Sequence, residues 1–128
     1  TTLDAAGSFT VNCVSSASQD RNVTYTAQLA VTPARQMAPP AGADRLTYEV
    51  YVDSSRTQPW GDGTGGTFTI SNTFFVPRKS SASDAPRNFY ARMTPGGQDV
   101  SAASPPPPPT TYTQTLTVTV TCTPSPPC

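Results

Sequence analysis

The segment that decides the fold is residues 111–121, which reads TYTQTLTVTVT. Threonine occupies every second position, and the side chains between the threonines form the other face: Tyr112, Gln114, Leu116, Val118 and Val120. This period of two is typical of a β-strand with one buried and one solvent-facing side. Only a short proline-rich stretch follows, so we expect no later hairpin of this chain to cover the free edge. We expect another subunit to pair with it.

Shorter stretches with the same period precede this segment. They lie at residues 9–13, 24–31, 46–52, 68–70, 74–76 and 89–93, separated by Gly, Pro, Ser and Asp. No stretch shows a sustained helical period. Six or seven short strands with regular turn signals predict an all-β fold, and a sandwich rather than a barrel.

The composition limits the functions to consider. A chain of 128 residues has the length of one domain, which we assign to residues 1–121, with a Pro/Cys-rich tail at 122–128. Charged residues make up 12%, and eight basic residues balance eight acidic ones. This balance gives no electrostatic argument for nucleic acid as a partner. No apolar run approaches the ~20 residues that cross a bilayer, so we expect no membrane span.

The sequence gives little support for catalysis. It contains no histidine, the commonest general base and metal ligand at neutral pH. The aspartates are scattered among turn residues, where their usual role is to hydrogen-bond the backbone. We therefore predict no catalytic residue, no metal site, no cofactor and no enzymatic activity.

Residues 60–66 read WGDGTGG. They match neither a calcium loop nor a phosphate loop, and they predict a tight turn with positive φ at the glycines. Trp60 has two interpretations: it caps one end of the core, or it is a surface contact that stacks on a sugar. The five prolines at 105–109 predict a stiff exposed loop, with docking of a proline-recognition module as the alternative.

Three cysteines, Cys13, Cys122 and Cys128, favour an oxidising compartment. Their odd number leaves one without a partner in this chain. A small loop between Cys122 and Cys128, a bond from the tail to Cys13 and a bond to another subunit all stay open.

Three stretches together resemble the spore coat protein U domain family, which includes subunits of the archaic, Csu-type chaperone-usher pili. They are LTYEVYVDSSRTQPWGDGTGG at 46–66, FYAR at 89–92 and YTQTLTVTV at 112–120. They occur in the family's order, and the resemblance extends over about residues 3–120.

The resemblance implies an incomplete immunoglobulin-like β-sandwich that is completed by a donor strand from another subunit. It also implies a route through the periplasm, with a chaperone and an outer-membrane usher as partners during assembly. The product would be a secreted cell-surface filament or a spore coat, built head to tail from identical or homologous subunits.

The chain departs from the family pattern at both ends. An N-terminal donor segment is not recognisable, and residues 4–13 resemble the family's cysteine-bearing second strand. Cys13 would then lack its usual partner. Phe9 and Val11 are expected in the core or, alternatively, in a donor strand.

We predict a structural subunit with Tyr112, Leu116, Val118 and Val120 on the groove side. A surface- or carbohydrate-binding tip adhesin that uses Trp60 is the alternative function.

Overall fold

The computed structural model describes residues 2–96, 98 and 111–124. Within these residues the chain forms ten β-strands and no helix. The strands are β1 (Leu3–Phe9), β2 (Asn12–Val14), β3 (Arg21–Leu29), β4 (Gln36–Met37), β5 (Leu46–Thr47), β6 (Glu49–Tyr51), β7 (Ile70–Val76), β8 (Ser81–Ser83), β9 (Arg87–Met93) and β10 (Val118–Thr123). The proline run at 105–109 lies outside the described residues. The predicted all-β fold is confirmed.

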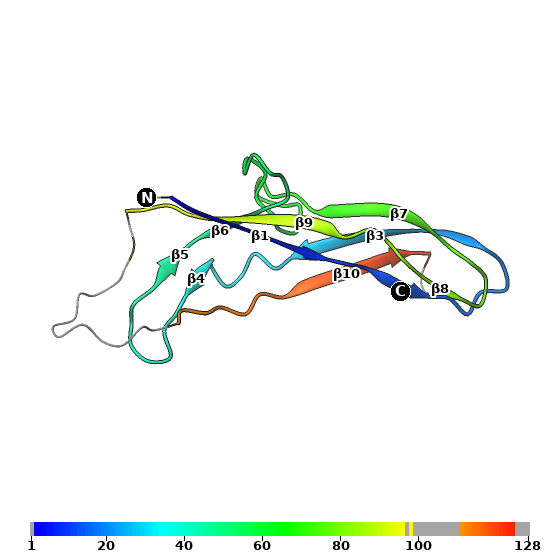
Figure 1. Cartoon of the computed structure of the whole chain (residues 1–128), viewed down its shortest axis with the longest axis horizontal. Coiled ribbons are helices and arrows are strands. Elements are labelled where there is room, and N and C mark those ends of the chain that lie inside the picture. Colours follow the sequence, from blue (N-terminus) through cyan, green and yellow to red (C-terminus); the bar gives the residue numbers. More distant parts are fainter. Residues whose placement is uncertain (1, 97, 99–110, 125–128) are drawn as a thin grey trace.

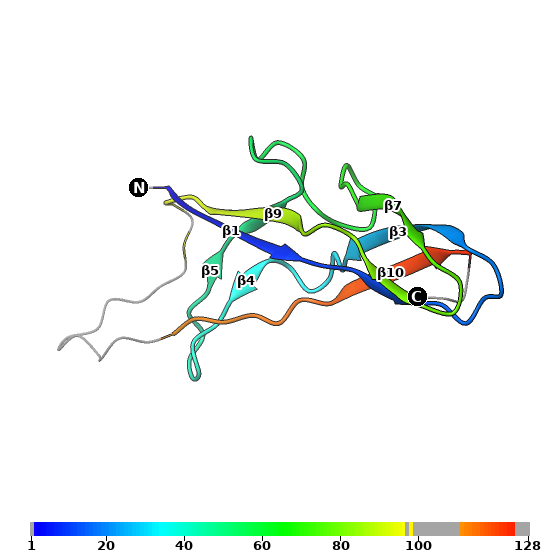
Figure 2. The ribbon, with the colours of Figure 1, turned by 45° about the vertical axis from the view of Figure 1, so that its right-hand side comes forward.

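Two three-stranded antiparallel sheets make up most of the molecule, in the orders β1-β9-β6 and β10-β3-β7. Two smaller pairs, β2-β8 and β4-β5, extend the structure. Figure 1 shows an elongated molecule in which the long strands run roughly along its length. Figure 2 turns it by 45°, and β1, β9 and β10 still follow that direction.

The core lies between the two main sheets. The strand β3 alternates strictly, and its inward side chains Val23, Tyr25, Ala27 and Leu29 are fully or almost fully buried. One cluster joins Val23 and Tyr25 to β2 and to Val76 of β7. A second cluster joins Ala27 and Leu29 to Val50 of β6 and to Trp60. Because inward residues of both sheets meet in these clusters, the architecture is an immunoglobulin-like β-sandwich.

The boundaries of several strands differ from the prediction. The terminal strand begins at Val118 rather than at residue 111, because its partner β3 ends at Leu29, opposite Val118. Thr117 still accepts a hydrogen bond from the amide of Ala30 at 2.9 Å, and residues 113–114 contact the β4 region instead. There Thr113 and Ala38 exchange two backbone hydrogen bonds of 2.9 Å. Gln114 receives a hydrogen bond from the amide of Gln36 at 2.9 Å. The apolar runs at 68–70 and 74–76 belong largely to one strand, β7.

The glycine turn forms as predicted, with positive φ at Gly63, Gly65 and Gly66. The side chain of Asp62 accepts a hydrogen bond from the amide of Thr64 at 2.9 Å, which closes the turn. The turn reverses the chain directly after Trp60, whose side chain packs in the core.

Candidate functional site

An apolar groove of about 500 Å³ runs along one side of the sandwich, between the β1–β2 region and β10. We call it the strand groove. Among the described residues, β1 and β10 each pair on one side only, with β9 and β3 respectively. The end of β1, at Phe9, and the strand β10 therefore flank this groove, and Figure 1 shows the end of β1 close to β10. The lining residues are Phe9, Thr10, Val11, Asn12, Leu29, Val50, Trp60, Phe89, Leu116, Val118 and Val120.

The floor of the groove is aromatic. Trp60 is 3% exposed, and its indole Nε1 donates a hydrogen bond to the carbonyl of Ala27 at 3.0 Å. Its ring stacks on Phe9 with a centroid distance of 5.6 Å, and Phe89 lies at the same distance on a tilted plane. Gly7 allows this packing, because a Cβ there would come within 2.5 Å of the Phe89 ring. The floor is therefore a rigid part of the core.

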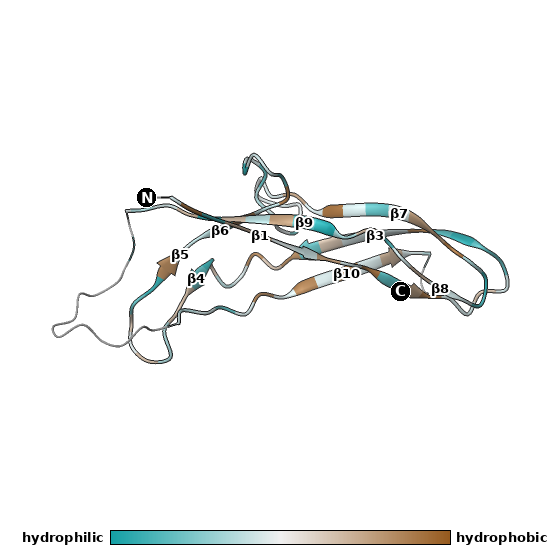
Figure 3. Cartoon of the chain, viewed as in Figure 1, coloured by the Kyte–Doolittle hydropathy of each residue, from teal (hydrophilic) through white to brown (hydrophobic). Residues whose placement is uncertain are grey.

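The wall formed by β10 leaves apolar side chains open. Val118 is 44% exposed and Val120 is 39% exposed, although both belong to the apolar face of the strand. Figure 3 colours the start of β10 as hydrophobic. A row of exposed β-branched side chains beside unpaired backbone groups is a surface on which another strand can add.

The opposite wall, β1, is held against β9 by an arginine in the turn after β6. Arg56 adopts φ 57° and donates hydrogen bonds to the carbonyls of Ala91 at 3.2 Å and Ala5 at 3.3 Å. Asp4 of β1 receives two hydrogen bonds from Arg92, at 2.7 and 2.9 Å, which hold its pKa below the usual value. These contacts fix β1 through its β9 side, so that its other edge stays available.

The turn that presents Arg56 is organised by Asp53. Its carboxylate accepts hydrogen bonds from the amides of Thr57 at 3.0 Å and Gln58 at 2.9 Å. Desolvation raises the pKa of Asp53, but hydrogen bonds from Ser55, Thr57 and Gln58 outweigh it and keep the pKa well below its usual range. The Asp53 carboxylate therefore stays ionised at neutral pH and keeps the turn closed.

A buried polar network lies behind the groove, at Asp84. Its carboxylate accepts hydrogen bonds from Tyr25 at 2.6 Å, from Asn72 at 3.0 Å and from Arg87 at 2.9 Å. Arg87 is the main cause that holds the pKa of Asp84 far below its usual value, against the effect of burial. Burial and the bond to Asp84 raise the pKa of Tyr25 to about 12. Because the network joins β3, β7 and β9, it fixes the two sheets relative to each other.

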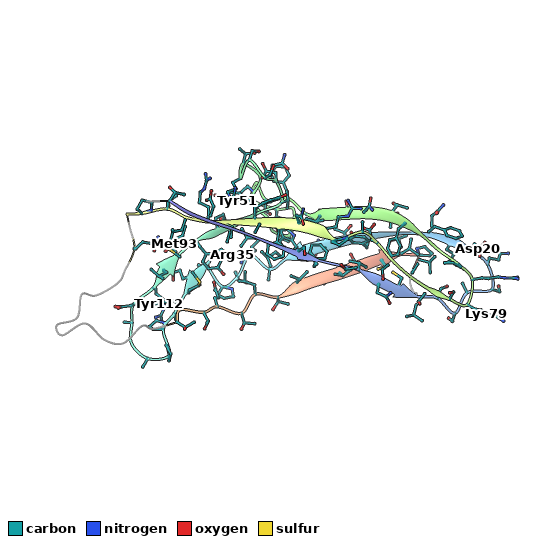
Figure 4. All side chains as sticks on the ribbon, viewed as in Figure 1. Asp20, Arg35, Tyr51, Lys79, Met93 and Tyr112 are labelled. Carbon is teal, nitrogen blue, oxygen red and sulfur yellow. The ribbon has the colours of Figure 1, made fainter. Side chains whose placement is uncertain are left out.

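Most of the residues predicted for the groove side do meet there. Leu116, Val118 and Val120 line the strand groove, and so do Phe9 and Val11. Both Phe9 and Val11 pack in the hydrophobic core of this chain. Tyr112 is not among the lining residues, and Figure 4 places it toward the end of the molecule opposite Asp20 and Lys79. The reason is that the neighbouring Thr113 pairs with Ala38, beside β4, and not with β3.

The interpretation of Trp60 as a surface contact is wrong, because the ring is buried. Cys13 is fully buried and is disulfide-bonded, whereas Cys122 is a half-buried free thiol. The small loop between Cys122 and Cys128 is therefore not formed, and Cys122 is not the residue that bonds to Cys13. Cys128 lies outside the described residues.

Neither a metal-binding cluster nor a long apolar helix occurs among the described residues. They contain no group of three or more His, Cys, Asp or Glu side chains placed to hold a metal ion. In the same part of the chain there is no helix with the length and hydropathy of a membrane span.

Fold and groove together define a class of protein: an immunoglobulin-like sandwich with two free strand edges beside one apolar groove. The Spore Coat Protein U domain matches residues 1–124, and the chain belongs to this family. The resemblance found in the sequence is thus confirmed. No curated protein and no solved structure matches the chain. Membership places the chain among pilus and spore-coat subunits, which form extracellular surface filaments or spore coats.

Proposed function

We propose that this chain is a structural subunit that polymerises by strand complementation, in which an extended segment of a neighbouring subunit occupies the strand groove. The observation that carries the proposal is the position of the groove between the end of β1 and β10, two strands that each have one unpaired edge among the described residues. A strand inserted there would hydrogen-bond to both edges at once. It would also cover Val118 and Val120, which are the exposed apolar residues of β10.

The contact between a donor segment and a groove is heterologous, because two different surfaces of the subunit meet. Repetition of such a contact does not close on itself and gives a filament. Before assembly the open groove is an aggregation hazard. This hazard supports the second part of the proposal: a periplasmic chaperone covers the groove, and an outer-membrane usher passes the subunit on. The subunit then acts at the cell surface or in a spore coat, and not as an enzyme.

The test adds a synthetic peptide of eleven residues, in which valine alternates with threonine, to the purified chain. We expect saturable binding, with slower amide hydrogen exchange in both β1 and β10, because both edges gain hydrogen bonds. A peptide of the same composition with all valines consecutive is the control, since it cannot present one apolar face.

Two variants localise the binding. Val120→Asp places a charge in the groove and is expected to raise the dissociation constant of the peptide at least tenfold. Val14→Asp changes a more exposed valine, 69% exposed, that does not line the groove, and is expected to leave binding unchanged. Unchanged exchange in β1 and β10, or equal effects of the two variants, would show that the proposal is wrong.

A further inference from the structure

A second opening lies on the other side of the sandwich, between β7 and β9, with a volume of about 470 Å³. We call it the polar cleft. Within the described residues, β7 is the outermost strand of its sheet, and β6 pairs with β9 only at Tyr90–Arg92. The first part of β9 therefore has a partner only on its β1 side. The polar lining of the cleft comes from Ser54, Thr69, Ser71, Arg87, Asn88 and Tyr90.

The side-chain hydroxyl and amide groups of this cleft are not engaged by other described residues. In the part of the chain that the structure describes, the side chains of Ser54, Thr69, Ser71, Asn88 and Tyr90 have no hydrogen-bond partner. They come from β7 and the residue before it, from β9 and from the turn after β6, and they line one concave surface. Such a surface offers several donors and acceptors to a ligand that carries many hydroxyl groups.

The charge of the cleft favours a neutral ligand. Arg87 is the one charged residue among the described residues that line it. Its guanidinium already donates to both carboxylate oxygens of Asp84, at 2.9 and 3.1 Å. Because this pair is mutually neutralised, the cleft attracts neither an anion nor a cation strongly.

Tyr90 gives the cleft an aromatic surface. The guanidinium of Arg56 lies 5.5 Å from the centroid of its ring, and this contact holds the ring in place. Aromatic rings pack against the C–H faces of pyranose sugars, while neighbouring hydroxyl and amide groups bind the sugar hydroxyls. Val52 and Ile70 add apolar surface to the cleft lining.

We propose that the polar cleft binds a neutral oligosaccharide. This site is separate from the strand groove, since β9 and β3 lie between the two openings. It gives a subunit a means to contact a polysaccharide surface along the side of an assembly. The inference does not depend on the proposed polymerisation.

The test titrates the full chain with maltotriose, cellotriose and chitotriose, and follows backbone amide shifts by NMR. We expect at least one of these sugars to give saturable shifts in β7 and β9, with a millimolar dissociation constant. The titration is repeated with the alternating peptide present, and the same sugar affinity is expected. Failure of the peptide to bind would leave the sugar result unaffected.

Asn88→Ala is expected to raise the dissociation constant of the sugar at least fivefold, because it removes a side-chain amide that both donates and accepts hydrogen bonds. Asn22→Ala is the matched control: Asn22 is an exposed strand asparagine outside the cleft lining, and its loss is expected to change nothing. Circular dichroism checks that both variants fold. The proposal is overturned if none of the three sugars gives saturable shifts, if the shifts map outside β7 and β9, or if both variants weaken binding equally.

Discussion

The strand groove and the polar cleft occupy equivalent places on opposite sides of the sandwich, yet their chemistry differs. Each lies where an outermost strand of one sheet faces a strand of the other with unpaired backbone groups. The groove is lined by valine, leucine and aromatic side chains, whereas the cleft is lined mainly by hydroxyl and amide groups. Water can solvate the second surface but not the first. Side-chain chemistry therefore decides which opening needs a protein segment to cover it.

The largest expected effect is a loss of stability on changing the floor of the strand groove, in contrast to a change in the polar cleft. Trp60→Ala removes two ring contacts and the hydrogen bond to Ala27, and it leaves a cavity in the core. We expect the free energy of unfolding to fall by about 3–5 kcal/mol. Asn88→Ala, in the exposed cleft, should stay within about 0.5 kcal/mol of the unmodified chain. Urea denaturation followed by circular dichroism measures both; similar losses would abolish the distinction between the two openings.

A smaller loss of stability is expected at Asp84, which connects the strand groove to the polar cleft. Its backbone amide bonds to Val11 at 3.0 Å beside the groove, and its carboxylate holds Arg87 beside the cleft. Asp84→Asn removes the buried negative charge from this pair and should cost about 3 kcal/mol. Tyr25→Phe removes one hydrogen bond only and should cost about 1 kcal/mol.

The same carboxylate predicts a pH dependence with a definite sign. The pKa of Asp84 is lowered in the folded chain from its usual value of 3.8, so its stabilising effect is present above that value. The effect is lost as the pH falls below about 4 and through the folded pKa. Denaturation between pH 2 and pH 7 measures the decline. It should be shallower in Asp84→Asn; an identical decline in both chains would assign the acid sensitivity to other carboxylates.

The smallest effect is expected at Arg56, which touches both regions through β1 and Tyr90. Arg56→Lys keeps the charge but loses the planar fork that reaches the carbonyls of Ala5 and Ala91. We expect a loss of about 1 kcal/mol and faster amide exchange in β1. Arg45→Lys, in a loop away from both openings, is the control. Protection of β1 that is unchanged in Arg56→Lys would show that β9 alone holds the groove wall.

The sequence predicted β3 and β9 well, because their alternation is a local signal, but it missed most of β1 (Leu3–Phe9), since the predicted pattern began only at residue 9. β3 is an example: Tyr25, Ala27 and Leu29 are buried as expected, although Val31, beyond the strand end, is 42% exposed. The short strands β4 and β8 carry no apolar alternation, and the pairing with β5 and β2 that defines them is not encoded locally. Tyr112 does not line the strand groove, because Gln114 hydrogen-bonds that segment to β4. This is a tertiary contact, which local alternation does not reveal.

The candidate site was predicted in part for the same reason. Alternation identified Leu116, Val118 and Val120 as one face, but it does not tell whether the same chain buries that face. Asp84 and Arg56 were missed as structural residues. Their partners come from distant strands, and an aspartate or arginine in a turn has no local pattern that distinguishes it from a solvated one.

The position of Trp60 has a practical consequence. It is the sole tryptophan of the chain, and its indole lies at the bottom of the strand groove against Phe9 and Phe89. Its intrinsic fluorescence therefore originates from one known place, next to the surface that an incoming segment would touch. A change in the emission wavelength or intensity of Trp60 after mixing would report the occupation of the strand groove in real time, without any added dye.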